Sequence, residues 1–348
     1  MRILLTLILL LTLIAPAWAP ESQLPGSLGK GVILLPNGWK IQPAGKHIPL
    51  DDLPLEMLES PDGQFLIVTN SGYSPPILSV IDLPQFRIKD RVKVKNAWLG
   101  LAMSNDGSTV YSSTGGNGEI QTFDFKNGKL KEKGLIKLEK PNPKSFVGGI
   151  ALGPDGKRLY AVQILGNTLH EIDIASGSIL RTITLDAEPY TVVTTSEGKK
   201  IFVSLWGGAK VLEIDAETFK IARSIEVGEH PNAMMFSKDG TRLFVACGNT
   251  NSVWVLDLTN GKPEEQISVA LYPQAPAGAT PSGLGISPDG STLLVTNSDN
   301  NAVAVVDISQ PGRSKVKGCI PSGWYPTAAK FTGDGKKILI ISGKGLTS

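Results

Sequence analysis

The sequence predicts an all-β protein, a seven-bladed β-propeller closed by pairing of its N- and C-terminal strands. Three observations support this prediction: a glycine-containing turn recurs seven times, an apolar run follows each turn, and an aspartate follows at a nearly constant distance. Repeats of about 40–50 residues that each supply four strands are typical of propellers. The 38 glycines and 24 prolines among 348 residues also suit many short strands joined by tight turns.

The recurring turn has the pattern Ser-x-Asp-Gly or a close variant, and its glycines are 42 to 50 residues apart. The run after each turn is nearly continuous in Val, Ile, Leu and Phe. Such runs indicate strands that are covered on both faces, as in a blade between two neighbours. The turns are residues 60–63, 104–107, 153–156, 196–198, 237–240, 287–290 and 333–335, and the runs are 65–70, 110–111, 159–162, 201–203, 243–246, 293–297 and 338–341.

A second strand of each repeat ends in aspartate. The distance from the turn glycine to this residue is 19 in the first copy and 17 in the next five. Because the turn acids and the strand-end acids recur in repeat after repeat, whereas a catalytic acid is needed once, we expect them to bind turn amides. The strand-end residues are Asp82, Asp124, Asp173, Asp215, Asp257 and Asp307.

The last repeat lacks its second hairpin, since 17 residues beyond Gly335 would pass the end of the sequence at 348. The segment around Asn37-Gly38 resembles the missing half. We therefore predict that residues 31–50 pair with residues 325–342 and complete one blade. This closure would also remove two exposed sheet edges.

The N-terminus has the pattern of a secretory signal: Arg2, an apolar run over 3–14, and Ala17-Trp18-Ala19 before the expected cleavage site. The run is shorter than the roughly 20 residues of a spanning helix. We expect residues 1–19 to be a cleaved signal peptide, 20–30 a linker and 31–348 the propeller. The mature chain should be periplasmic or secreted, without stable membrane insertion.

Composition and motifs argue against several functions. The 34 basic and 32 acidic residues nearly balance, which argues against a nucleic-acid partner. His47, His170 and His230 show no ligand spacing, so neither a metal site nor a cofactor is expected; a carboxylate ring in the central channel is the one alternative left open. Cys247 and Cys319 fall in different repeats, which favours two buried or half-buried thiols and leaves a disulfide between them as the alternative. No Ser or Cys lies in a recognisable catalytic frame, so no catalytic residue is assigned.

The repeats resemble the YVTN-type, YncE-like propeller family, which occurs in bacterial and archaeal exported and surface-layer proteins. The likeness rests on Ser-Pro-Asp-Gly at 60–63 and 287–290, the Val-Thr-Asn strand ends at 68–70 and 295–297, and Val-Ile-Asp at 80–82. It covers essentially the whole mature chain and implies a propeller fold.

The C-terminal part, with Gly323-Trp324-Tyr325-Pro326 and Ser342-Gly343-Lys344-Gly345, is similar to the last propeller unit of proteins in which such a ring is fused to an alkaline-phosphatase-type phosphoesterase domain. This resemblance implies that a fused or associated phosphoesterase is a candidate partner. The metal ligands of that family would lie beyond residue 348.

Propeller topology indicates where a ligand would bind. If strands A to D run outward from the axis, the B–C loops and the D–A crossovers share one face, which we call the crossover face. Loops on a rigid scaffold commonly carry binding residues. The two longest spacings fall on this face, at 140–144 and 271–281. The candidate binding residues are Trp98, Phe146, Gln163, Tyr190, Trp206, His230, Asn249, Asn297, Trp324 and Tyr325.

These observations favour an exported, non-enzymatic binding or scaffold module that engages a ligand or a protein through the crossover face. Two alternatives remain. The chain could be the propeller part of a phosphoesterase whose catalytic domain lies elsewhere, or a lactonase-like hydrolase, which would need a compact polar cluster in the funnel. Fold alone supports neither enzyme.

Overall fold

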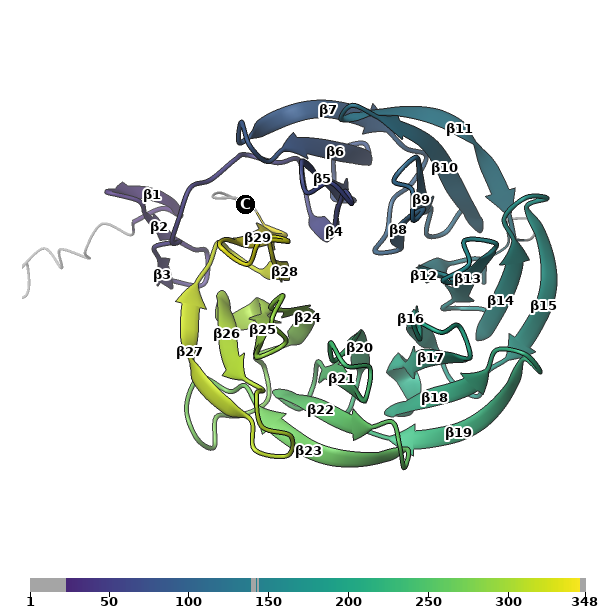
Figure 1. Ribbon diagram of the computed structural model, residues 1–348. Coiled ribbons are helices and arrows are strands. Elements are labelled where there is room, and N and C mark those ends of the chain that lie inside the picture. The colour runs from purple at the N-terminus through teal and green to yellow at the C-terminus, as the bar shows by residue number, and fades with distance from the viewer. Residues whose placement is uncertain (1–22, 139–141, 143, 345–348) are drawn as a thin grey trace, which may run out of the picture.

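The computed structural model describes residues 23–138, 142 and 144–344, and in these residues the chain forms a ring of seven small antiparallel sheets with one further sheet outside it (Figure 1). The predicted signal peptide and part of the loop at 139–143 lie outside the described residues. Six blades have four strands each, arranged consecutively from the axis outward. The all-β, seven-bladed propeller predicted from the repeats is therefore confirmed.

The strands follow the repeats closely. Blade 1 contains β4 (Pro54–Glu59), β5 (Phe65–Asn70), β6 (Ile77–Asp82) and β7 (Arg87–Lys93); blade 2 contains β8 (Leu101–Met103), β9 (Thr109–Ser113), β10 (Glu119–Lys126) and β11 (Lys129–Lys137). Blade 3 contains β12 (Val147–Leu152), β13 (Arg158–Gln163), β14 (Thr168–Asp173) and β15 (Ser178–Thr184); blade 4 contains β16 (Pro189–Thr194), β17 (Lys200–Leu205), β18 (Lys210–Asp215) and β19 (Lys220–Glu226).

The same order continues around the ring. Blade 5 contains β20 (Pro231–Phe236), β21 (Arg242–Cys247), β22 (Ser252–Asp257) and β23 (Lys262–Ser268); blade 6 contains β24 (Pro281–Ile286), β25 (Thr292–Asn297), β26 (Ala302–Asp307) and β27 (Lys315–Pro321). Blade 7 contains β28 (Pro326–Phe331) and β29 (Ile338–Ser342). Two short 3-10 helices, η1 (Trp206–Gly208) and η2 (Ser298–Asn300), lie in B–C loops.

In blades 2 to 6 the second strand is the most buried, because it lies between strands A and C and between two neighbouring blades; in blade 1 the third strand β6 is buried throughout. Every residue of β21 is buried, and Phe202 of β17 and Phe244 of β21 are fully buried between blades. The outermost strands β7 and β15 instead alternate between exposed and half-buried positions. Continuous apolar runs therefore predicted the interior strands correctly, as expected for sheets covered on both faces.

The recurring acidic turns are hydrogen-bonded as predicted. In the turn at 237–240, Ser237 Oγ donates to Asp239 Oδ1 at 2.5 Å, and the same oxygen accepts the Thr241 N–H at 3.1 Å. The Ser237 hydroxyl is the main cause that lowers the pKa of Asp239 to about 2. Gly240 has φ of 70°, a left-handed conformation that favours glycine. Equivalent hydroxyl–carboxylate bonds occur at residues 60–62, 104–106, 287–289 and 332–334.

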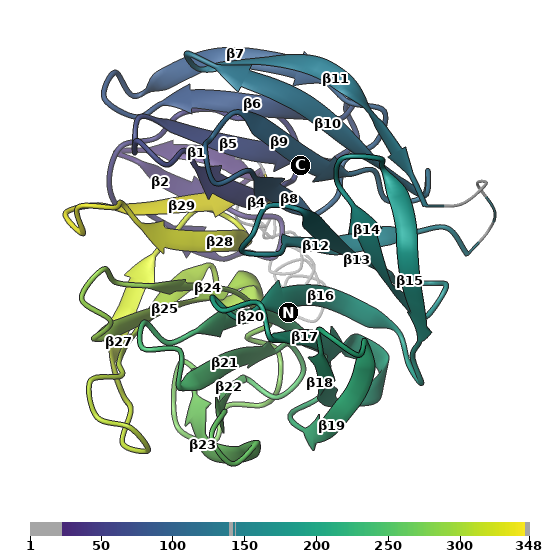
Figure 2. The same cartoon turned by 45° about the vertical axis from the view of Figure 1, so that its right-hand side comes forward.

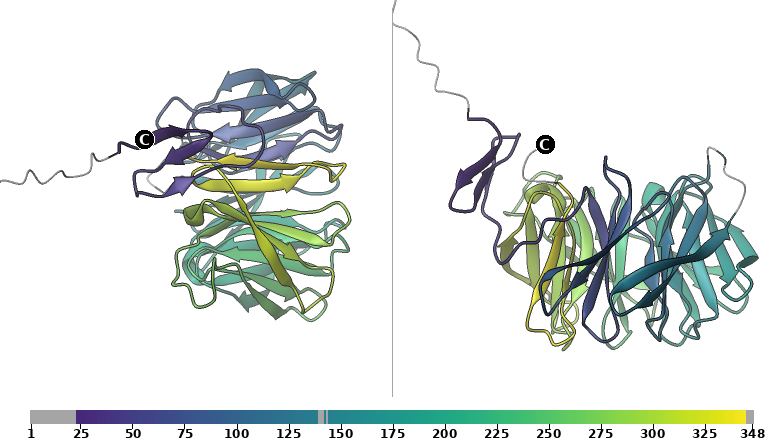
Figure 3. Two further views of the ribbon diagram at one scale, coloured as in Figure 1. Left: turned by 90° about the vertical axis from the view of Figure 1, so that its left-hand side faces the viewer. Right: turned by 90° about the horizontal axis from the view of Figure 1, so that it is seen from above.

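The predicted closure by terminal strands is wrong in its pairing. Residues 26–41 form their own sheet of β1 (Gly26–Gly29), β2 (Val32–Leu34) and β3 (Lys40–Ile41), which stands beside blades 6 and 7 (Figures 1 and 3). Among the described residues, no ladder joins this sheet to β29, and β1 occupies part of the expected linker. The sheet is held by the contact of Ile33, Leu35 and Ile41 with Trp324.

The ring closes instead by packing blade 7 directly against blade 1. Thr327 Oγ1 of β28 donates to the Pro54 carbonyl of β4 at 2.7 Å. Ala328 and Ile341 pack with Met57 of β4 in one apolar cluster, which the extended segment after β3 covers with Ile48 and other side chains. The physical reason is that side-chain contacts join the innermost strands β28 and β4, so no shared ladder is required at the seam.

The antiparallel order of each blade brings the B–C loops and the D–A crossovers to the same face (Figure 2). Cys247 is buried in β21 and Cys319 is exposed in β27, and both are free thiols. The prediction of free thiols is confirmed, but Cys319 is not buried, because β27 is an outermost strand with a mostly exposed side-chain pattern.

Replacing Asp239 by Asn should destabilise the ring in a pH-dependent way. The lowered pKa of Asp239 means that its carboxylate stabilises the folded state above its ordinary value of 3.8 and loses this effect as pH falls toward about 2. We expect Asp239→Asn to cost about 1 kcal/mol at pH 7, and the difference in melting temperature from the wild type to vanish near pH 2.

A matched control is Asp155→Asn, because its turn has Gly153 in place of the serine and, among the described residues, Asp155 accepts only the Lys157 N–H, at 2.9 Å. This variant should lose less stability at pH 7. Equal losses for the two variants, or a loss at position 239 that is independent of pH, would contradict the assigned role of the hydroxyl–carboxylate bond.

Candidate functional site

The crossover face is held together by main-chain bonds between crossovers and B–C loops. The N–H groups of Gly248 and Gly343 donate to the carbonyls of His230 and Tyr325, at 3.0 and 2.7 Å. His230 and Tyr325 both have a left-handed backbone and both precede the first proline of an innermost strand. Leu53 and Thr280 repeat this arrangement, so the unusual backbone belongs to the architecture and makes the face a rigid platform.

Trp206 and His230 form the most open ring contact of the face. The indole and imidazole stack with centroids 3.9 Å apart and an angle of 8° between their planes. Trp206 lies in η1 between β17 and β18, and 41% of its surface is exposed. The stack therefore presents a flat aromatic surface to solvent, held by two loops from neighbouring blades 4 and 5.

Trp98 and Phe146 form a second pair, between the crossovers into blades 2 and 3. Their rings meet edge to face with centroids 5.2 Å apart. The Trp98 indole N–H and the Gln163 amide nitrogen at the end of β13 are buried, and neither has a hydrogen-bond partner among the described residues. The side chains of Trp98 and Phe146 are both less exposed than that of Trp206, so this aromatic pair mainly packs the two crossovers against each other.

Tyr190 and Tyr325 lie near the axis of the ring together with a residue that the sequence pattern did not single out, Glu56 of β4. Burial raises the pKa of Tyr190 to about 12, with further contributions from Tyr325 and Glu56. These residues belong to blades 4, 7 and 1, so they influence one another across the centre. Burial also raises the pKa of Glu56 to about 7, opposed by the Met57 N–H and by Lys330.

Trp324 and Tyr325 have a cation of the same chain over their rings. Lys344 Nζ lies 5.3 Å from the Trp324 centroid and 4.2 Å from the Tyr325 centroid. Trp324 also packs against the N-terminal sheet. This part of the crossover face is therefore engaged in tying the chain ends to the ring.

The three predicted amide residues are not brought together. Asn297 is fully buried, and its Nδ2 donates to the Val269 carbonyl at 2.7 Å, which supports the crossover between blades 5 and 6. Gln163 is buried at the end of β13, whereas Asn249 is exposed in its B–C loop. Sequence position placed these residues on the crossover face but could not distinguish structural amides from accessible ones.

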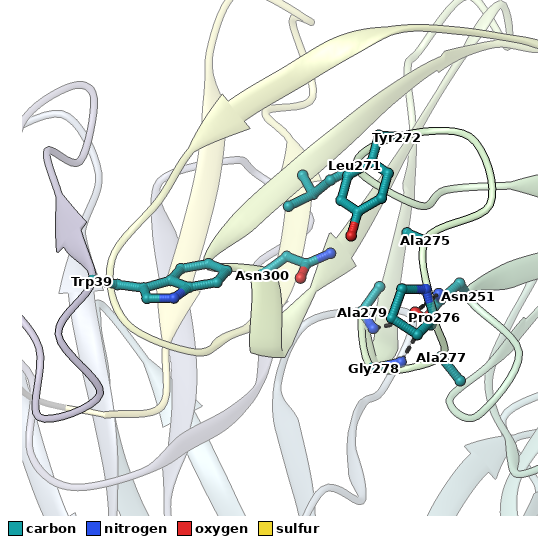
Figure 4. Close-up of a pocket in the computed structure, with 10 residues that line it drawn as sticks. All are labelled: Trp39, Asn251, Leu271, Tyr272, Ala275, Pro276, Ala277, Gly278, Ala279 and Asn300. Carbon is teal, nitrogen blue, oxygen red and sulfur yellow. Dashed lines mark hydrogen bonds between the residues drawn. The ribbon is translucent and has the colours of Figure 1, made fainter.

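The sequence pattern did not predict a groove on this face. A groove of about 190 Å³ lies between the crossover at 271–279, two B–C loops and Trp39 of the N-terminal sheet (Figure 4). The long spacing at 271–281 signalled the crossover, but nothing in the pattern placed Trp39 beside it. In the described part of the chain, no group of three or more His, Cys, Asp or Glu side chains could hold a metal ion.

Comparisons with known proteins agree on the fold. The family model described as "Lactonase, 7-bladed beta-propeller" matches residues 187–344, which contain blades 4 to 7. A chain of hydrazine synthase from Kuenenia stuttgartiensis is similar with a TM-score of 0.69 and 18% identity, covering 86% of this chain and 98% of that chain. No curated protein matches the sequence.

At that level of identity the structural likeness concerns the fold alone. Within residues 23–344, apart from the gaps given above, no helix has both the length and the apolar character to cross a bilayer. Together, the repeats, the ring and the two matches establish a seven-bladed β-propeller with an aromatic crossover face.

Replacing Glu56 by Gln should stabilise the protein at neutral pH. Because its folded-state pKa is raised from 4.5 to about 7, the stability contributed by the protonated carboxyl is present below pH 4.5 and lost as pH rises to about 7. The free energy of unfolding of Glu56→Gln, compared with that of the wild type, should therefore be up to about 3 kcal/mol larger at pH 8 than at pH 4.5. Denaturant melts at both values measure this; a gain that does not change with pH would contradict the burial of the charge.

Proposed function

We propose that this chain is an exported binding module that engages a ligand or protein partner through its crossover face. The distribution of exposed aromatic residues carries this proposal. Among the described residues, the exposed Trp and Tyr side chains are Trp39, Tyr73, Trp206 and Tyr272. The last three lie in B–C loops or crossovers, and Trp39 adjoins the same face at the groove. Exposed aromatic side chains gathered on one face favour recognition.

The rigidity of the face supports the same proposal. The Trp206–His230 stack is held by loops that bond to one another, so little conformational entropy is lost when a partner covers it. Trp and Tyr are also the side chains that most often dominate binding energy. The opposite face consists of tight A–B and C–D turns, in which the acidic residues are engaged in hydrogen bonds within their own turns.

A site-specific cross-linking experiment tests this proposal. A photoreactive phenylalanine analogue is placed at position 206, and at position 86 as the matched control, because Phe86 is 38% exposed in a C–D turn of the opposite face. After irradiation in an extracytoplasmic extract of the producing cells, we expect adducts at 206 and not at 86. The captured species is then purified, and Trp206→Ala should weaken its binding about tenfold. Adducts at 86 alone, or undiminished binding by Trp206→Ala, would refute the proposal.

A second candidate is a lactonase-like hydrolase, which two observations favour. The lactonase propeller model matches blades 4 to 7. Glu56, near the axis, has the pKa of a general base suited to neutral pH. Its carboxylate would take the proton of a water molecule that attacks the lactone carbonyl; the ring C–O bond then breaks, and the leaving alkoxide takes up a proton.

Hydrolysis of glucono-δ-lactone distinguishes the two candidates. A hydrolase that uses Glu56 should show kcat/KM rising with pH through about 7 and then levelling, because the base must be deprotonated. Glu56→Gln should reduce this rate at least about a hundredfold. If the wild type is no faster than buffer, or if Glu56→Gln retains the rate, this candidate fails and the binding proposal stands alone.

A further inference from the structure

The groove beside Trp39 is formed by four separate segments of the chain. Trp39 comes from the turn between β2 and β3, Tyr272 and its neighbours from the long crossover into blade 6, and Asn251 and Asn300 from B–C loops of blades 5 and 6. The volume is about 190 Å³. This is below the roughly 300–1,000 Å³ of pockets that enclose a drug-sized ligand, so the groove would hold one unit of a longer molecule.

The wall of the groove is preformed. Asn251 is buried, and its side chain holds the crossover by donating to the Pro276 carbonyl at 2.7 Å and accepting the N–H groups of Gly278 and Ala279 at 3.0 and 2.7 Å (Figure 4). These bonds occupy the Pro276 carbonyl and the Gly278 and Ala279 N–H groups, so these three groups are not free to pair with an extended peptide. The amide of Asn251 is likewise occupied and serves as a support rather than a contact.

The open surfaces of the groove are aromatic and amide groups. Trp39 and Tyr272 are 45% and 59% exposed, and the side chain of Asn300 lies between them (Figure 4). Asn300 makes no side-chain hydrogen bond to any described residue, so both its donor and its acceptor face the groove unpaired. Neighbouring hydroxyl groups can pair with such an amide, one donating to its oxygen and another accepting from its NH₂.

The lining has no charge. None of the ten described residues that line the groove is Asp, Glu, Lys, Arg or His. An ionic ligand would lose hydration on entering the groove and gain no opposite charge, which is unfavourable. The complementary ligand is therefore neutral, has an apolar face for the rings and carries hydroxyl groups at its edge.

We propose that this groove binds one ring of a neutral saccharide, with its C–H faces against Trp39 and Tyr272 and its hydroxyls bonded to Asn300. The inference rests on the proposed binding function of the crossover face and specifies the ligand class at one site of it. Because Trp39 comes from the N-terminal sheet, that sheet completes the groove. This gives a role to a segment that lies outside the ring.

Isothermal titration of the full chain with neutral oligosaccharides tests the proposal. The probes are cellohexaose, maltohexaose and N-acetylchitohexaose, with polygalacturonate hexamer as the charged comparison and decaproline as the peptide comparison. We expect at least one neutral probe to bind, with an affinity that changes less than about twofold between low and high salt. Trp39→Ala, Tyr272→Ala and Asn300→Ala should each weaken this binding about tenfold or more.

Phe86→Ala and Leu180→Ala are the matched controls, because they remove exposed apolar side chains that lie outside the groove. They should leave the saccharide affinity within about twofold. Weakening by Trp206→Ala but not by Trp39→Ala would refute the groove. No binding of any neutral probe, or Trp39-dependent binding of decaproline alone, would refute the saccharide while leaving the cross-linking test at position 206 to decide the broader function.

Discussion

Everything that the crossover face can do depends on closure of the ring at the seam between blades 7 and 1. Six blades contain four strands each, whereas blade 7 contains only β28 and β29. No hydrogen-bonded ladder of the described residues crosses this seam. The Thr327–Pro54 bond, the cluster around Met57 and the packing of Ile48 near β29 hold it. If the seam opened, Glu56, Tyr190 and Tyr325 would separate, because they come from blades on both sides of it.

The face combines rigid architecture with a few accessible groups. Main-chain bonds from B–C loops to crossovers recur in successive blades, and they place Trp206 against His230 and hold Tyr325 near the axis. The main-chain bonds recur from blade to blade, whereas the side chains that a ligand could reach differ between blades. One aromatic stack lies over blades 4 and 5, one neutral groove lies over blades 5 and 6, and one carboxyl of raised pKa lies near the centre. Substitutions at these three features therefore distinguish a binding function from a hydrolytic one in experiments.

The fold could be predicted from the sequence because its determinants are local and repeated. Ser237, Asp239 and Gly240 specify the turn at 237–240 through hydrogen bonds and a left-handed backbone. The continuous apolar run after each turn indicates a strand that is buried on both faces. The closure was predicted wrongly because it depends on a choice between two partners for β29. The Asn37-Gly38 hairpin has the right local pattern, but local pattern does not determine which edge a hairpin joins.

The position of the candidate binding residues could be predicted at the level of the face, and their exposure could not be predicted residue by residue. Alternation and topology placed all ten candidates in B–C loops, in crossovers or at the strand ends beside them. Whether Asn297 supports a crossover or Trp206 meets solvent depends on contacts between blades, which no single repeat encodes. Glu56 was missed because its strand position is occupied by small residues such as Gly149 and Gly283 in other blades, so the repeat pattern gave it no weight.

Hydrogen exchange at the seam tests the central claim most directly. Thr327→Val removes the bond from β28 to β4, and Thr194→Val removes another bond between innermost strands of neighbouring blades, from β16 to the Leu152 carbonyl of β12, which is 2.9 Å long. If closure rests on the seam, Thr327→Val should accelerate exchange of β4, β28 and β29 about tenfold relative to the other blades, whereas Thr194→Val should produce no such local opening. Uniform acceleration in both variants, or slow exchange at β28 in Thr327→Val, would contradict closure through this contact.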